Sequence, residues 1–151
     1  MNSDPLDVNV DDIDFSYPII PAALYDFRIK SVEVKPNKEG SGENLVFQLA
    51  TQTEIQSVKG ESVPIGFVLT HNISLRETEK YTLIEIGKRI AAVAQAAQVR
   101  GVTPRDIIRN PQQLVGRVVT AKVQISKERT DARTGTTYNE RSEIHSFVVK
   151  K

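Results

Sequence analysis

The feature that most constrains the fold of this chain is an alternation of apolar and polar residues that recurs in several separate segments. In residues 24–34, aromatic and aliphatic side chains alternate with charged ones. Successive side chains of a β-strand point to opposite faces, so this pattern predicts a strand with one buried face. Residues 44–53, 65–74, 117–126 and 141–149 repeat the pattern between turn-forming or polar sequences. We therefore expect five strands, with hairpins joining the first two and the last two.

One long helix is predicted between the third and fourth of these strands. Ser74 and Glu77 have the spacing of a capping box, so we expect the helix to begin there. Gly101 can adopt the left-handed conformation that ends a helix. Apolar residues then recur at spacings of three and four and predict the buried stripe: Leu83, Ile86, Ile90, Val93 and Ala97.

The order of these elements indicates the fold class. Three strands, a helix and two further strands follow one another in an oligonucleotide/oligosaccharide-binding (OB) barrel. We expect a mainly β protein with one long helix, built as an OB-fold-like five-stranded barrel with the helix between strands 3 and 4. An open α+β sheet with the same elements is the alternative, because order alone does not fix closure. A length of 151 residues fits one domain, placed at residues 17–151.

Charge is unevenly distributed along the chain. Residues 1–16 contain five aspartates and no basic side chain, giving −5, whereas residues 17–151 carry +6. Within the latter, residues 117–151 hold eight basic side chains against four acidic ones. The first segment is predicted to be a flexible acidic tail. A tethered polyanion can also occupy a basic groove or dock on a basic partner.

Motifs for enzymatic chemistry are absent from the sequence. The chain has no cysteine, no phosphate-binding glycine loop and no GxSxG sequence. Its two histidines, His71 and His145, have no metal-ligand spacing around them. We therefore expect a protein that is not an enzyme and that uses no cofactor or metal. Without a signal peptide or a long apolar run, an intracellular location away from membranes is expected.

Basic and aromatic side chains of the strands favour nucleic acid as a ligand. Cations on one sheet face can neutralise successive phosphates, and an exposed ring can stack on a base. Tyr138, surrounded by polar residues, is the best candidate for stacking, whereas core positions are favoured for Phe147 and Tyr25. The candidate nucleic-acid-binding residues are Arg28, Lys30, Lys122, Lys127, Arg129, Arg133, Tyr138 and Arg141.

Four stretches also carry a family resemblance: LYDFRIKSVEVKPNKEGSGENLVFQLATQ, IGKRIAAVAQAAQV, NPQQLVGRVVTAKVQISK and TYNERSEI. In their order and spacing they resemble a family of small phage and prophage proteins known mainly as a domain of unknown function. Some relatives of that family are identified as single-stranded-DNA-binding proteins with an OB-type barrel. One difference is that bacterial single-stranded-DNA-binding proteins end in an acidic tip, whereas this chain is acidic at its start.

The resemblance implies a phage or prophage single-stranded-DNA-binding protein that coats single strands during replication or recombination in the host cytoplasm. The alternative is an adaptor that binds other replication or recombination proteins without affinity for nucleic acid. The sequence does not distinguish DNA from RNA, and the oligomeric state is left open.

Overall fold

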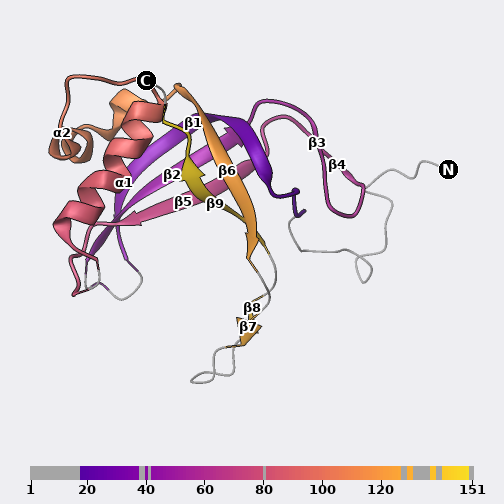
Figure 1. Cartoon of the computed structure of the whole chain (residues 1–151), viewed down its shortest axis with the longest axis horizontal. Helices are drawn as coiled ribbons and strands as arrows, with labels where there is room; N and C mark the ends of the chain where they lie inside the picture. Colours follow the sequence, from indigo (N-terminus) through magenta and orange to yellow (C-terminus); the bar gives the residue numbers. More distant parts are fainter. Residues whose placement is uncertain are drawn as a thin grey trace.

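The computed structural model describes residues 18–37, 40, 42–79, 81–126, 129–130, 137–138 and 141–149. The predicted acidic tail, residues 1–16, therefore lies outside the described residues. Strands and helices follow one another along the chain in the order shown in Figure 1: β1 (Ala23–Pro36), β2 (Glu43–Thr51), β3 (Ile55–Gln56), β4 (Ser62–Val63), β5 (Val68–Ser74), α1 (Leu83–Ala96), α2 (Pro104–Arg109), the 3₁₀ turn η3 (Pro111–Leu114), β6 (Val118–Ser126), β7 (Arg129–Thr130), β8 (Thr137–Tyr138) and β9 (Arg141–Phe147).

The fold is mainly β and centres on one five-stranded antiparallel sheet with the strand order β5-β2-β1-β6-β9. Both predicted hairpin pairings are present, because β1 pairs with β2 and β6 pairs with β9. β7 and β8 pair as a separate two-stranded ribbon, the β7–β8 ribbon, which extends beyond the ends of β6 and β9 (Figure 1).

The sheet does not close into the expected barrel. No hydrogen-bonded ladder joins the edge strands β5 and β9 in the described part of the chain. Side chains meet there instead, since the rings of His71 and Phe147 lie 5.3 Å apart between centroids. The two edges therefore approach one another through side-chain packing.

The helical segment also differs from the single long helix that was expected. Two α-helices and a 3₁₀ turn lie between β5 and β6. In chain order they come after five strands, because the segment expected to be a polar loop forms the small β3–β4 hairpin. Ile55 and Val63 of this hairpin are buried in the core.

Alternation along the strands produces the core. Phe27 and Ile29 of β1 are completely buried against the inner residues of β2 and β6. A register shift between Ile29 and Ser31 returns Val32 to the inner face, so one long strand lines the core on both sides of the bulge.

Helix α1 begins later than the sequence predicts, because β5 continues through Ser74. Thr82 is the N-cap and accepts a hydrogen bond from the Glu85 N–H, at 3.3 Å. The Glu77 carboxylate accepts from the Leu83 N–H, at 2.9 Å. Leu83 was expected in the buried stripe, but it lies in the first turn, beyond the sheet, and is 62% exposed. The residues that pack on the core are Ile86, Ile90, Val93, Ala94 and Ala96.

The two ends of the core are covered by different elements. Helix α1 packs against β5, β6 and β9, and Figure 1 shows the β3–β4 hairpin on the side away from it. On that side Ile20 is completely buried, and its N–H donates to the Ser142 hydroxyl at 2.9 Å. The carbonyl of Ile19 accepts from the Val58 N–H, at 2.8 Å. Residues 18–21 thus join β9 to the small hairpin.

Candidate nucleic-acid interface

The outer face of β1, β6 and β9 carries four of the predicted cations. Arg28 and Lys30 occupy positions of β1 that face away from the core, and both are exposed. Lys122 is exposed on β6 and pairs across the sheet with Leu24. Arg141 pairs with Ser126 where β9 begins, and it is exposed as well. The structure therefore brings Arg28, Lys30, Lys122 and Arg141 to one face, which we call the outer basic face.

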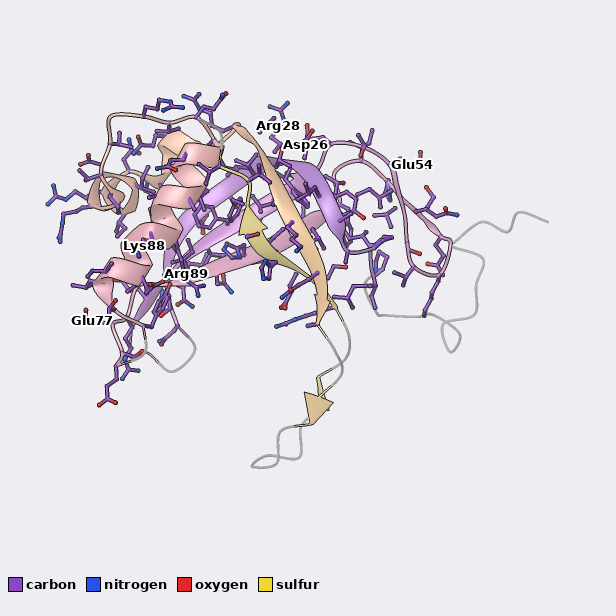
Figure 2. The ribbon with its side chains drawn as sticks, in the orientation of Figure 1. Asp26, Arg28, Glu54, Glu77, Lys88 and Arg89 are labelled. Atoms are coloured by element: carbon purple, nitrogen blue, oxygen red, sulfur yellow. The ribbon has the colours of Figure 1, made fainter. Side chains whose placement is uncertain are left out.

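Two acidic side chains interrupt this face: Asp26 on β1, and Glu143 on β9, which accepts from the Gln124 side chain at 3.1 Å. Asp26 lies two positions before Arg28 on β1, and Figure 2 shows the two side chains next to one another. The Asp26 carboxylate accepts a hydrogen bond from the Thr120 hydroxyl, whereas the Arg28 guanidinium donates to the Gly116 carbonyl at 3.1 Å. Arg28 is thus held toward the start of β6.

The remaining predicted residues belong to the long connection between β6 and β9. Lys127 and Arg133 lie outside the described residues. The backbones of Arg129 and Tyr138 pair directly across the β7–β8 ribbon. The stacking role of Tyr138 stays a prediction, since only its backbone is described.

Two other aromatic side chains contribute to the fold. The Tyr25 hydroxyl donates to the Pro21 carbonyl at 2.6 Å, and its ring packs edge-on against Phe27. Phe147 is partly buried beside His71. These contacts agree with the expectation that both residues pack on the core.

His71 is the titratable group most affected by its surroundings. Its ring lies between Phe47, at 6.1 Å, and Phe147, at 5.3 Å, measured between centroids. Burial, helped by the positive charge of Arg89, lowers the pKa of His71 to about 4. The imidazole is therefore neutral at pH 7 and has a packing role between the two edge strands.

A metal site and a membrane-spanning helix each make specific requirements of the described residues. No group of three His, Cys, Asp or Glu side chains there could hold a metal ion. A hollow of about 240 Å³ lies between α1 and α2, and no carboxylate or imidazole lines it. None of the helices described is long and apolar enough to cross a membrane.

Three exposed arginines near the outer basic face were missed at the sequence level. Arg105 and Arg109 lie on α2, and Arg117 directly precedes β6. The signal that could have found them is a charge count over residues 86–126, which contain seven basic side chains and one acidic one.

Comparison with known proteins adds no family assignment. No protein-family model matches this chain, and no curated protein matches it.

Proposed function

We propose that this protein binds single-stranded nucleic acid, without catalysing a reaction, through the outer basic face and the adjoining β7–β8 ribbon. The observation that carries the proposal is the alignment of Arg28, Lys30, Lys122 and Arg141 on one face of the sheet. Cations in this arrangement displace counterions from a phosphate backbone, and the released counterions supply much of the affinity.

The fold is consistent with this role. We propose that the five-stranded sheet is a partly open OB-like barrel, in which the loop between the last two strands contributes to ligand binding. Here that loop carries Lys127, Arg129, Arg133 and Tyr138. The ribbon extends away from the sheet (Figure 1), so a strand bound on the outer basic face could also contact it.

The biological setting that we propose is the coating of single strands during phage or prophage replication or recombination, in the host cytoplasm. It rests on the family resemblance of the sequence. The ligand is single-stranded DNA in this setting, and the comparison of oligo-dT with oligo-rU tests that choice.

Fluorescence anisotropy with labelled oligo-dT tests the proposal. We expect affinity to fall steeply as salt rises, with a slope of about −0.7 per phosphate contact in a log–log plot. Arg133→Ala or Tyr138→Ala should weaken binding further, Tyr138→Ala by about 1–3 kcal/mol if the ring stacks on a base. Lys59→Ala, an exposed cation in the turn between β3 and β4, is the matched control. The absence of salt-dependent binding to any single strand would refute the proposal.

A second function is favoured by a different surface. Leu83 and Ile84, adjacent in the first turn of α1, are 62% and 70% exposed. Exposed apolar pairs of this kind suit an adaptor that contacts other replication or recombination proteins. Two measurements on the variant Leu83→Ser/Ile84→Ser separate the two functions. An adaptor should lose its protein partners in a pull-down from infected cells, whereas a nucleic-acid-binding protein should keep its affinity for the oligonucleotide.

A further inference from the structure

The segment that runs from within α1 to the end of β6 is strongly basic. From Ile86 to Ser126 the chain has seven basic side chains and a single acidic one, Asp106. Residues 43–85, by comparison, have three basic against six acidic side chains. The positive charge is therefore carried by α1, α2 and β6 and by the connecting residues Arg100 and Arg117, whereas η3 has no charged side chain.

Helix α2 presents two of these charges on one side. Arg105 and Arg109 are four positions apart, so they are neighbours on the helix surface, and both are exposed. Asp106 is engaged elsewhere, because it accepts from the Thr103 N–H at 2.9 Å. Hydrogen bonds from Thr103, with a smaller contribution from Arg109, hold the pKa of Asp106 below its usual value. This single carboxylate offsets only part of the local positive charge.

The turn η3 brings these arginines toward β1. The Gln112 side chain donates to the Val32 carbonyl at 3.3 Å. The Gly116 N–H donates to the Ile29 carbonyl, and the Ile29 N–H donates to the Arg117 carbonyl, both at 2.8 Å. Arg117 is thereby fixed beside Ile29, whose two chain neighbours are Arg28 and Lys30. The turn η3 has four residues at about 2 Å each, so it adds only about 8 Å to the path between α2 and Arg117.

We propose that Arg105, Arg109 and Arg117, together with Arg28 and Lys30, form a second phosphate-binding surface for single-stranded nucleic acid. We call it the connector surface. It extends the proposed interface past the start of β6, at the end opposite the β7–β8 ribbon. This inference rests on the proposed function, because it adds a path for the same ligand.

The chemistry of the connector surface suits a phosphate backbone. Four of its five cations are guanidinium groups, which present paired donors to phosphate oxygens. None of the five forms an ion pair with a carboxylate of the described residues.

The test compares two charge-matched double variants in oligo-dT binding. Arg105→Ala/Arg109→Ala removes the α2 cations, whereas Lys59→Ala/Lys88→Ala removes two exposed cations elsewhere; Figure 2 shows Lys88 on α1 away from Arg28. The oligonucleotide should exceed the roughly 16 nucleotides that one OB barrel occupies at most. We expect the first variant to reduce the slope of the salt dependence by about 1.4, from two lost phosphate contacts. The control should keep the slope of the unaltered protein.

The outcomes separate this inference from the proposed function. If the unaltered protein fails to bind oligo-dT, the proposed function is wrong, and the connector surface falls with it. If the unaltered protein binds and Arg105→Ala/Arg109→Ala retains its slope and affinity, only the connector surface is wrong. Loss of poly-glutamate binding by this variant, with oligo-dT binding retained, would assign the surface to an acidic protein and overturn the inference. Unchanged circular dichroism spectra exclude misfolding as a cause.

Discussion

His71 of β5 and Phe147 of β9 pack edge to face, with 5.3 Å between their ring centroids, although their strands form opposite edges of the sheet. No backbone ladder joins these strands in the described residues, so the two edges meet through side chains. The His71 imidazole packs there as a neutral ring, because its pKa is lowered to about 4. Protonation of His71 would place a charge between two aromatic rings near Arg89.

Stability should therefore fall in mild acid. An unfolded histidine titrates near 6.5, whereas His71 titrates near pH 4, so between these values the unfolded chain binds more protons. The contribution of neutral His71 to the free energy of unfolding is complete above pH 6.5. It is lost as the pH falls toward 4, and the loss is at most about 3 kcal/mol. Urea unfolding at a series of pH values measures the loss. His71→Phe should flatten the pH dependence, and the exposed His145→Gln should not. An equal slope in His71→Phe and the unaltered protein would contradict this role.

Replacing Thr51 by valine should destabilise the link between β2 and β5. Thr51 is 1% exposed, and its hydroxyl accepts from the Phe67 N–H at 3.1 Å and donates to the Pro64 carbonyl at 3.4 Å. Valine keeps the shape but leaves these groups less well paired, which costs about 1–3 kcal/mol. Thermal unfolding measures the loss, and Thr53→Val at an exposed position serves as the control. Equal effects at the two sites would show that the buried hydroxyl has no special role.

Truncating Ile20 should destabilise the whole domain. This side chain is completely buried at the end of the core away from α1, so Ile20→Ala should reduce the free energy of unfolding by about 2–5 kcal/mol. Ile65→Ala, at a side chain 66% exposed, should change it by no more than about 0.5 kcal/mol. A small effect of Ile20→Ala would mean that residues 18–21 are dispensable for the fold.

Removing residues 1–16 should tighten binding to oligo-dT several-fold at low salt. The segment carries −5 and leads into Ile20, whose N–H binds Ser142 next to Arg141. Because the point of attachment lies near Arg141, we expect this charge to compete with phosphates for the outer basic face. A full-length variant with the five aspartates replaced by asparagine should reproduce the gain. Unchanged or weaker affinity in both variants would refute the prediction that the acidic segment competes with the oligonucleotide.

Local patterns predicted the long strands and failed for the short ones. Alternation located β1, β2, β6 and β9 because side-chain direction follows directly from the extended backbone. The strands β3 and β4 have two residues each, too few to show a period. The spacing of Ser74 and Glu77 suggested a cap, but pairing of Asn44 with Ser74 extends β5 to that serine. The tertiary contact overrides the local signal.

The residues of the proposed interface were predicted only where they lie on a strand. Outward positions of Arg28, Lys30 and Lys122 come from alternation alone. Arg105, Arg109 and Arg117 approach them only because η3 packs on β1, which no local pattern encodes. A charge count over residues 17–151 also hides Arg105 and Arg109, since it combines the acidic stretch 43–85 with the basic segment 86–126.

The central strand has a consequence for how the chain folds as it is synthesised. Residues 23–28 of β1 pair with β6, whereas β2 pairs with β1 only from Phe27 onward, and Ala23 lies opposite Val123. Until the ribosome has made β6, residues 23–26 therefore have no partner strand in the sheet. The nascent chain therefore exposes an unpaired strand edge through most of its synthesis, and a chaperone that binds extended segments would have its longest opportunity at residues 23–28.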